Sequence, residues 1–334
     1  MKAVVLVGGF GTRLRPLTLT TPKQMLPVID RPMLEHVIGG LGAHGVDEVT
    51  LSLGYKEDVF REAYPAGECA RVALKYAVEP EPLDTAGAVR FAAEAAGIDE
   101  TFIVINGDVF TDLDVRSVWD RHHEVGAAGT IALTPVDDPS RYGVVPTDEA
   151  GKVLGFVEKP PRDEAPTNWI NAGTYVLEPS VLAGIDPGRR VSIERETFPA
   201  IVADGGLWAV QSDAYWVDAG TPDTYLQIQM DLLDGVRGQP VEGVSADAMI
   251  ADGATVERSV VMAGASVAAG AVVRDAVISF GATVRAGATV EGSVIGPNAV
   301  IGERAKLTAM TMIGDGAVVD AGRALEGGRL PESD

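Results

Sequence analysis

The chain has little cysteine, little histidine and no long hydrophobic run. Cys69 is the only cysteine among 334 residues, so the sequence has no disulfide framework and no thiolate metal cluster. The four histidines, the last of them His123, lack the spacing of zinc ligands. No apolar stretch approaches the ~20 residues that a membrane helix needs, and the apolar start at residues 1–7 is too short for a signal peptide. We therefore expect a cytoplasmic protein with no membrane partner.

Positive charge is also scarce. The 27 Lys and Arg residues against 48 Asp and Glu give a formal net charge of −21. Such a balance disfavours binding to nucleic acids and to anionic membranes. An anionic substrate would need a few well-placed cations or a metal ion. The hydrophobic fraction of 46% is enough to build a core, and the length suits two domains, because single cores stop growing near ~250 residues.

Aromatic residues nearly disappear after Val244, where a repeat begins. Three consecutive blocks of 17 residues, 257–273, 274–290 and 291–307, carry apolar residues at the same offsets. The series, extended backward and forward, comprises Val244, Ile250, Val256, Val261, Val267, Val273, Ile278, Val284, Val290, Ile295, Ile301, Leu307, Ile313, Val319 and Leu325. Most steps are of six residues, which is a rotation of ~600° in a helix and would scatter the apolar positions around it.

A triangular solenoid explains this spacing. Each side is a short strand with one apolar side chain on the axis, and each corner is a turn. Small residues such as Gly281-Ala282 and Gly287-Ala288 stand where the chain bends. The pattern resembles the hexapeptide repeats of left-handed β-helices. We expect a left-handed parallel β-helix at residues 244–325 and a tail at 326–334.

Residues 1–235 show alternating strand and helix patterns. Strands are expected at 2–7, 49–53, 72–78 and 102–105, and helices at 33–44, 86–95 and 224–233. The alternation predicts an α/β domain with a Rossmann-like mixed sheet covered on both faces. A hairpin is expected where 143–145 and 153–158 flank a turn at 148–151. Residues 235–243 would link this domain to the solenoid.

A glycine-rich loop follows the first strand, with the sequence Gly8-Gly9-Phe10-Gly11-Thr12-Arg13-Leu14-Arg15-Pro16. Glycines let backbone N–H groups approach an anion, and arginine supplies charge. The dinucleotide-binding pattern fails because its third glycine is replaced by leucine, and the Walker pattern fails because Lys-Ser/Thr is missing. Lys23 adds a second cation. We predict a phosphate-binding loop of another kind.

A carboxylate, Asp108, directly follows the strand expected at 102–105. Ligands of α/β sheets bind at the carboxyl ends of the strands. If Asp218 lies nearby, the pair would suit Mg²⁺, since two carboxylates plus phosphate oxygens are what an octahedral Mg²⁺ accepts. The alternative is that Asp108 caps a turn and that Asp218 is a turn residue.

Eight motifs, in order, resemble the signature of the sugar-1-phosphate nucleotidylyltransferases. They are residues 8–18 with Pro22-Lys23, then 83–87, 106–108, 142–145, 156–160, 170–173, 192–196 and 216–220. With the β-helix, the chain is most similar to the group that forms GDP-mannose. The resemblance implies transfer of a nucleotidyl group from a nucleoside triphosphate, here GTP, to a sugar 1-phosphate, here mannose 1-phosphate, with release of pyrophosphate.

The resemblance also implies a role for each matching residue. Backbone groups of Leu6, Gly8 and Gly9 would contact base and ribose, and Thr85 and Gly87 would border the base. The triphosphate would be held by Gly11, Thr12, Arg13 and Lys23, with Arg13 steadying the pyrophosphate. Asp108 and Asp218 would bind Mg²⁺. The sugar hydroxyls would be held by Gly143, Glu158 and Asn171, and the sugar phosphate by Lys159.

The reaction would be in-line attack by a sugar-phosphate oxygen on the α-phosphorus. Two polyanions must meet, and unit like charges ~4 Å apart repel by about 4 kcal/mol at an effective dielectric of ~20. Neutralisation and positioning should therefore dominate catalysis. The attacking oxygen is already ionised at neutral pH, so no general base is required. These residues could also have purely structural roles: Glu158 and Lys159 could form a surface ion pair, and Asn171 could cap a turn.

Some residues depart from the GDP-mannose-forming group. Asp84 stands where that group usually has glycine, Gly107 stands where it often has serine, and residues 22–28 resemble the thymidylyltransferases. Glucose-1-phosphate thymidylyl or uridylyl transfer is therefore the alternative within the family.

Two further readings come from other classes. Acyl transfer, common among β-helix proteins, is disfavoured because the solenoid contains no histidine. A non-catalytic regulatory subunit is disfavoured by the retained charges Arg13, Lys23, Asp108, Lys159 and Asp218. Solenoids present long faces that need covering, so we expect a homo-oligomer.

Overall fold

The computed structural model describes residues 1–54 and 56–332, which form two compact units. Unit 1 contains residues 1–9 and 34–216, and unit 2 contains residues 10–33 and the chain from 217 onward. This division differs from the contiguous domains expected from the sequence. Residues 10–33 belong with helix α6 (Pro222–Leu233) because they bond to it: Ile29 N–H donates to Gln229 Oε1 at 2.8 Å, and Gln229 Nε2 donates to Pro27 O at 2.9 Å.

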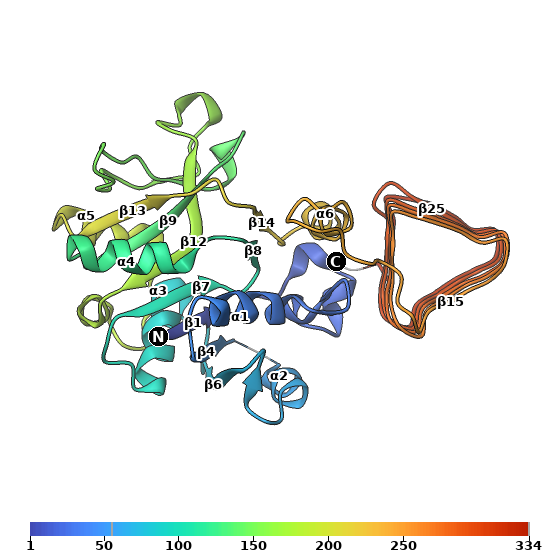
Figure 1. Ribbon diagram of the computed structural model, residues 1–334, viewed down its shortest axis with the longest axis horizontal. Helices are drawn as coiled ribbons and strands as arrows, with labels where there is room; N and C mark the ends of the chain where they lie inside the picture. Colours follow the sequence, from blue (N-terminus) through green and yellow to red (C-terminus); the bar gives the residue numbers. More distant parts are fainter. Residues whose placement is uncertain (55, 333–334) are drawn as a thin grey trace. The chain divides into compact units, whose positions relative to one another are not determined.

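Unit 1 is built on a mixed sheet, as predicted (Figure 1). Its parallel strands are β1 (Lys2–Leu6), β4 (Glu48–Leu53), β6 (Val72–Val78) and β7 (Phe102–Asn106). The other strands are β5 (Glu68–Cys69), β9 (Gly129–Pro135), β10 (Gly143–Val144), β11 (Val157–Glu158), β12 (Trp169–Leu177) and β13 (Leu207–Gln211). The main path runs β11-β10-β12-β7-β1-β4-β6-β5, and β9 joins β12 to β13. Because β1 lies between β4 and β7, the loop after β1 leaves from the centre of the sheet.

Helices pack on this sheet and bury aliphatic side chains against it. They are α1 (Met33–Ala43), α2 (Glu57–Ala63), α3 (Asp84–Ala96), α4 (Val115–Val125) and α5 (Phe198–Ala203). Helix α3 contacts β1, β4 and β6, and α4 contacts β9 and β12. Asp114 caps α4 by accepting hydrogen bonds from the backbone N–H groups of Arg116 and Ser117. The strands and helices expected in this region are thus confirmed, with ends shifted by one or two residues.

The hairpin is shorter than predicted. Gly143 pairs with Glu158 and Val144 with Val157, whereas Val153 makes only an isolated bridge to Thr147. The ladder is interrupted because residues 152–153 turn toward β13: Val153 N–H donates to Leu207 O at 3.0 Å. The predicted turn is present, with Gly151 N–H donating to Asp148 O at 3.0 Å.

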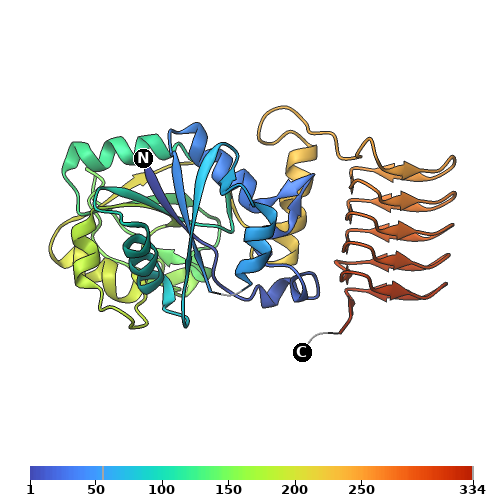
Figure 2. The same ribbon diagram turned by 90° about the horizontal axis from the view of Figure 1, so that it is seen from below.

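Unit 2 contains a triangular β-helix, seen down its axis in Figure 1 and from the side in Figure 2. Its three parallel sheets have five strands each, as expected for a left-handed β-helix of hexapeptide repeats. The first side consists of β15 (Met249–Ile250), β18 (Ser266–Val267), β21 (Thr283–Val284), β24 (Val300–Ile301) and β27 (Val318–Val319). The second consists of β16 (Thr255–Glu257), β19 (Val272–Arg274), β22 (Thr289–Glu291), β25 (Lys306–Thr308) and β28 (Ala324–Glu326). The third consists of β17 (Val260–Val261), β20 (Val277–Ile278), β23 (Val294–Ile295), β26 (Met312–Ile313) and β29 (Arg329–Leu330).

The register of the β-helix follows the sequence repeat and then departs from it once. Val290 pairs with Leu307, 17 positions on, but Leu307 pairs with Leu325, 18 positions on. The extra residue sits in the corner where Ala309 and Met310 both have positive φ, 52° and 61°. The ladder also continues past the predicted end at residue 325, because β29 pairs with β26.

The axis of the β-helix is filled by the predicted apolar residues, but its first coil is open. Ile301 is fully buried, as are its counterparts in the inner coils. In the first coil Ile250 is 39% exposed and Met249 62% exposed. On the third side even outward residues such as Val277 and Met312 are buried. Pro16, which belongs to the same unit, lies near this side, its Cβ 3.1 Å from the position of a Cβ on Gly314. None of the described helices is both long enough and apolar enough to cross a bilayer.

Candidate functional site

The loop after β1 continues into unit 2 as two short turns, which carry the cations Arg13 and Lys23. Gly11 has φ 59° and precedes a 3₁₀ turn at Thr12–Leu14, and Lys23 begins another at Lys23–Met25. Thr18 Oγ1 donates to Gly11 O at 2.8 Å, and a Cβ on Gly11 would lie 3.3 Å from Lys23 Cβ. The absence of a side chain at Gly11 therefore lets Lys23 lie against it. Thr12 and Arg13 are exposed, so their polar groups are accessible to an anion.

Arg13 and Asp218 meet over Gly220 within unit 2. A Cβ on Gly220 would lie 2.6 Å from an Arg13 Nη and 2.8 Å from Asp218 Oδ1. Only glycine leaves room for both side chains at this point. The structure thus joins two predicted site residues that are 205 positions apart in sequence (218 − 13).

In unit 1 the carboxyl ends of β1 and β7 lie side by side. Leu6 pairs with Asn106, and Gly107 N–H donates to Leu6 O at 2.9 Å. A Cβ on Gly107 would lie 2.8 Å from a Val7 methyl carbon, which explains why this chain has no larger residue before Asp108. Gly8 and Gly9 are exposed directly after β1. Asp108 is therefore fixed at the sheet edge where ligands of α/β folds bind.

The two predicted metal ligands differ in their surroundings. Asp108 belongs to unit 1 and Asp218 to unit 2. Among the described residues no cluster of three or more His, Cys, Asp or Glu side chains could hold a metal. A carboxylate pair that leaves the remaining positions to phosphate and water oxygens suits Mg²⁺, which keeps several waters and binds through one or two carboxylates.

Thr85 and Gly87 lie in the first turn of α3, against the segment that follows residue 188. Ala86 N–H donates to Val191 O at 2.9 Å, and a Cβ on Gly87 would lie 2.8 Å from Arg189 O. Gly87 is therefore a close-packing residue, whereas Thr85 is half-exposed. Asp84 has φ 60°, a conformation that favours glycine, and its Oδ1 accepts from Thr85 N–H at 2.8 Å. This local bond explains how aspartate is accommodated at a positive φ.

The predicted sugar residues cluster around the β10–β11 pair. A Cβ on Gly143 would lie 2.5 Å from the Phe156 ring and 3.2 Å from Glu158 Oε2. Glycine at 143 therefore lets Phe156 and the Glu158 carboxylate approach the strand. Lys159 Nζ lies 3.3 Å from Glu158 Oε1, and the Lys159 backbone has φ 49°. Lys159 is 59% exposed, so this ion pair contributes little stability and its cation is accessible to a ligand.

Asn171 stands at a β-bulge where β12 changes partners. The register with β9 shifts between Asn171 and Tyr175, and Gly173 in between has φ 72°. Asn171 Oδ1 accepts from Gly173 N–H at 2.8 Å, and Asn171 Nδ2 donates to the Tyr175 hydroxyl at 2.9 Å. Bulges re-aim side chains next to active sites. Asn171 therefore does cap a turn, which was the structural alternative to a role in binding. Its side chain is also held by the hydrogen bond to Tyr175.

Sequence reasoning missed two polar residues of this region, Tyr175 and Glu194. Tyr175 is fully buried, and burial, together with the charges of Glu194, Asp108 and Glu158, raises its pKa. Its hydroxyl therefore stays protonated. The available signal was the motif at 192–196, which was noted without a role for any of its residues.

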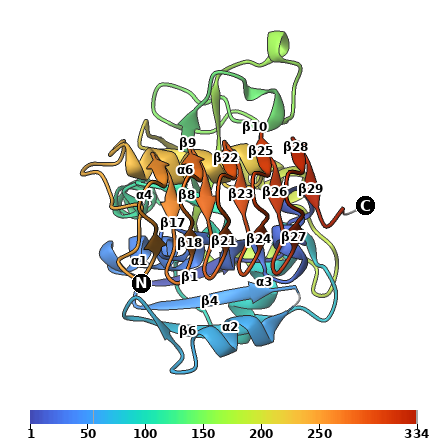
Figure 3. The same ribbon diagram turned by 90° about the vertical axis from the view of Figure 1, so that its right-hand side faces the viewer.

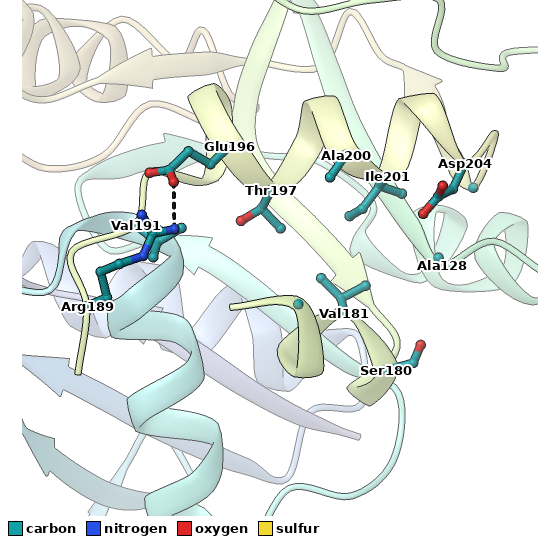
Figure 4. A pocket seen from close by; sticks show the side chains of 12 residues that line it. Ala128, Ser180, Val181, Arg189, Val191, Glu196, Thr197, Ala200, Ile201 and Asp204 are labelled. Carbon is teal, nitrogen blue, oxygen red and sulfur yellow. Dashed lines mark hydrogen bonds and ion pairs between the residues drawn. The ribbon is translucent and has the colours of Figure 1, made fainter. Parts of the chain in front are cut away.

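A cavity of about 280 Å³ lies on the far side of that motif (Figure 4). Its walls include Val181, Ile201, Thr197 and an ion pair in which Arg189 Nη2 lies 2.7 Å from Glu196 Oε2. None of the residues predicted to bind substrate lines it.

Comparison with known proteins adds two family matches. The family described as Nucleotidyl transferase matches residues 2–235. The family described as GlmU-like, C-terminal hexapeptide matches residues 232–307 and 254–326. The two matches together span the α/β region and most of the β-helix.

Similar proteins come from bacteria and fungi. The chain is 40% identical over 267 residues to the mannose-1-phosphate guanylyltransferase of Mycobacterium tuberculosis, covering 78% of this chain and 73% of that protein. It is 44% identical over 230 residues to the mannose-1-phosphate guanyltransferase of Aspergillus fumigatus, covering 68% of this chain and 62% of that one. Among solved structures, HddC from Yersinia pseudotuberculosis superposes with a TM-score of 0.59 at 31% identity, covering 68% of this chain and 97% of HddC.

Proposed function

Because the chain belongs to the nucleotidyl transferase family, we propose that it transfers a guanylyl group from GTP to mannose 1-phosphate, forming GDP-mannose and pyrophosphate. The observation that carries this proposal is the 40% identity, over 267 residues, to a protein named mannose-1-phosphate guanylyltransferase. Support for a phosphate site comes from unit 2, where Lys23 lies against Gly11 and the Arg13 guanidinium lies beside Gly220 and Asp218.

The residues of this chain bind and orient the two anionic substrates. Gly11, Thr12, Arg13 and Lys23 hold the triphosphate, and the Arg13 guanidinium takes up charge on the departing pyrophosphate. Lys159 holds the sugar phosphate, whose oxygen attacks the α-phosphorus in line. Nearby cations lower the repulsion between the anions where charge develops. No side chain needs to remove a proton, because the attacking oxygen is already ionised.

The base and the sugar are recognised at separate sets of residues. Leu6, Gly8 and Gly9 contact base and ribose through the backbone, and Thr85 and Gly87 border the base. Gly143, Glu158 and Asn171 hold the sugar hydroxyls. Support comes from the exposed backbone after β1 and from the two hydrogen bonds that fix Asn171.

A divalent metal is part of this proposal, since enzymes of the family generally use one. We assign Mg²⁺ to Asp108 and Asp218, because hard carboxylate oxygens are its preferred protein ligands. When bound, the ion would neutralise phosphate charge and orient the phosphates for displacement. Cys69, the one cysteine, is a buried free thiol, which fits a reducing cytoplasm.

The test is a product assay with four nucleoside triphosphates against mannose 1-phosphate and glucose 1-phosphate. GTP with mannose 1-phosphate should give the highest kcat/KM. A preference for dTTP or UTP would instead establish the alternative within the family, and nucleotide binding without pyrophosphate release would indicate a regulatory subunit.

Asp108→Ala should lower kcat at least ~100-fold with the fold intact, because metal ligation is lost. The matched control is Asp120→Ala, which removes an exposed carboxylate of α4 that pairs with Arg116. Near-normal turnover of Asp108→Ala would refute the metal role. Anomalous scattering from Mn²⁺ soaked into crystals would locate the ion directly.

We also propose that the chain forms a homo-oligomer through the first side of the β-helix. The outward residues of this side form an uncharged row, and Figure 3 labels the strands β18, β21, β24 and β27 that carry four of them. From first to last coil they are Met249, Ser266, Thr283, Val300 and Val318. The large apolar residues of this row stand at the ends, Met249 62% and Val318 59% exposed.

A two-fold axis through Thr283 would make this row self-complementary. Met249 would then meet Val318 of the partner subunit, as isologous contacts require. Thr283→Lys would place two like charges on the axis and should shift the protein toward monomer in analytical ultracentrifugation. Thr289→Lys, at the equivalent position of the second side, is the control. Wild-type monomer at micromolar concentration would exclude this interface.

A further inference from the structure

The segment after Val191 forms a widened turn held by side chains. Residues Ile193–Thr197 form a π-helical turn, in which Thr197 N–H donates to Ser192 O at 3.4 Å. Such turns are rare and are frequent at functional sites. Two hydroxyls converge on one carboxylate oxygen there: Glu194 Oε2 accepts from Thr85 Oγ1 at 3.1 Å and from Ser192 Oγ at 3.0 Å.

These hydrogen bonds leave the other oxygen of Glu194 available. Thr85 Oγ1 accepts from Ile193 N–H at 2.9 Å, and Ser192 Oγ accepts from Arg195 N–H at 3.3 Å. Each hydroxyl is therefore oriented so that its proton points to Oε2. No described residue donates a hydrogen bond to Oε1, and the side chain is only half-buried. The carboxylate is thus held in place with one acceptor available for a ligand.

The two glutamates of this turn serve different surroundings. Glu196 pairs with Arg189 and lines the cavity of Figure 4, whose walls do not include Glu194. Glu194 instead lies close enough to the Tyr175 hydroxyl to act on it electrostatically, as do Asp108 and Glu158. Glu194 therefore lies on the side of the turn that faces Thr85, and Glu196 lies on the side that faces the cavity.

Tyr175 connects this turn to the sugar residues. Its ring packs against Phe198, directly after the turn, with centroids 5.0 Å apart and an angle of 73° between the planes. Its hydroxyl accepts the hydrogen bond from Asn171. Hydrogen bonds thus join Asn171 to Tyr175 and Glu194 to Thr85 at the start of α3, and the Tyr175–Phe198 ring contact links the two pairs along the chain.

We propose that Glu194 is a specificity-determining residue of the sugar site, whose carboxylate accepts hydrogen bonds from ring hydroxyls of the sugar 1-phosphate. This inference rests on the proposed function and deepens it. A carboxylate is an acceptor only, so it matches the hydroxyls of a sugar, which can all donate. Charge-assisted hydrogen bonds are shorter and about twice as strong as neutral ones. The bonds from Thr85 and Ser192 fix the side chain before the sugar arrives, which lowers the ordering cost of binding.

The experiment compares Glu194→Gln with Glu196→Gln, which removes the same charge from the same turn on its cavity side. Glu194→Gln should raise KM for mannose 1-phosphate about tenfold or more. It should change KM for GTP less than about twofold, and Glu196→Gln should change neither. Titration calorimetry with mannose 1-phosphate alone should show the same loss of affinity. Deoxy analogues of mannose 1-phosphate identify the hydroxyl, because the analogue lacking it should lose no further affinity in Glu194→Gln.

Three outcomes would overturn the inference. The first is an unchanged KM for the sugar phosphate, and the second is an equal rise in both KM values, which indicates that Glu194 only supports Thr85. The third is an equal effect of Glu196→Gln. If Glu194→Gln does not fold, Glu194→Asp is the second variant, because it keeps the charge on a side chain shorter by one methylene. It should likewise raise KM for mannose 1-phosphate and leave KM for GTP nearly unchanged. Wild-type protein that binds mannose 1-phosphate in the calorimeter but forms no nucleotide sugar would overturn the proposed function and not this inference.

Discussion

The β-helix and the α/β sheet differ in how far apart in sequence their contacting residues lie. In the β-helix each residue finds its ladder partner in the neighbouring coil, as Val273 does with Val290. In the α/β sheet Val5 pairs with Leu51 on one side and with Ile105 on the other. A short fixed spacing leaves a visible repeat in the sequence, whereas long and unequal spacings leave none. The regular repeat of the β-helix is therefore visible in the sequence, whereas the pairing of the α/β sheet is not.

The two regions also differ in what their cores contain. The axis of the β-helix is lined by Val, Ile, Leu and Ala side chains, without a titratable group among the described core residues. The α/β core holds buried polar groups such as Tyr175 and His122, each with a hydrogen-bond partner. Polar groups require individual partners at defined distances, and only irregular, long-range packing supplies them.

The prediction with the largest expected effect concerns the axis of the β-helix. It tests whether the burial of an axis residue, rather than its position in the repeat, sets its contribution to stability. Ile301→Ala should lower the free energy of unfolding by about 2–5 kcal/mol, because it removes most of a fully buried side chain and leaves a cavity. Ile250→Ala, at the same position of the open first coil, should cost less than about 1 kcal/mol, since Ile250 is 39% exposed. Urea unfolding of both variants provides the measurement. Equal losses would show that position in the repeat alone sets stability.

A second prediction compares two glycines whose φ angles are nearly equal. Gly173→Ala should cost about 2–4 kcal/mol, because φ is 72° and a Cβ would lie 2.6 Å from Asn106 Nδ2. Gly270→Ala in the β-helix has φ 70° but no atom closer than 3.8 Å, so only the backbone strain of about 1 kcal/mol applies. Thermal unfolding of both variants distinguishes them. A greater loss at Gly270 would contradict the close packing described at the bulge.

A third prediction separates activity from stability. Gly220→Ala should lower kcat/KM about tenfold, because its methyl group would displace Arg13 from Asp218 and misplaced charge lowers transition-state stabilisation. Gly184→Ala, where no atom lies within 4 Å of the new Cβ, is the control and should keep full activity. Circular dichroism should show that both variants are folded. Full activity of Gly220→Ala would mean that Arg13 acts from another position.

The smallest expected effect is a pH dependence that originates in the α/β core. Burial lowers the pKa of His122, despite the hydrogen bond with Glu178. The unfolded chain therefore binds a proton that the folded state does not, so stability is full above the ordinary histidine pKa of ~6.5 and is lost as pH falls below it. Urea unfolding should show lower stability at pH 5.5 than at pH 7.5, and His122→Gln should make this loss smaller. The exposed His123→Gln should retain the full loss.

Much of the fold was predictable from local patterns. The spacing of apolar residues and the length of each apolar segment reveal the alternation of helices with β1, β4, β6 and β7. The apolar repeat of the β-helix likewise gives its register. The corner at Ala309–Met310 and the interrupted hairpin were not predictable, because each depends on a partner distant in sequence. Val153, for example, bonds to β13 instead of completing its hairpin.

The candidate site was predictable in its parts and not in its arrangement. The sequence indicated Arg13 and Asp218 separately, but their convergence over Gly220 depends on the way residues 10–33 pack with the chain after 217. Glu194 stood within the motif at 192–196 but was given no role, because a glutamate between isoleucine and arginine is equally typical of a surface turn. Its importance became visible only through the hydroxyls of Thr85 and Ser192.

By itself the sequence determined the solenoid, the alternation of strands and helices, and the types of side chain available for binding phosphate. These properties follow from periodicity and composition, which act between near neighbours. The tertiary structure alone decided which of those side chains meet, and which glutamate of the turn at 193–197 lines the cavity and which bonds to Thr85 instead. A hydrogen bond or an ion pair depends on distances of a few ångströms, and in this protein those distances join residues more than a hundred positions apart, such as Thr85 and Glu194.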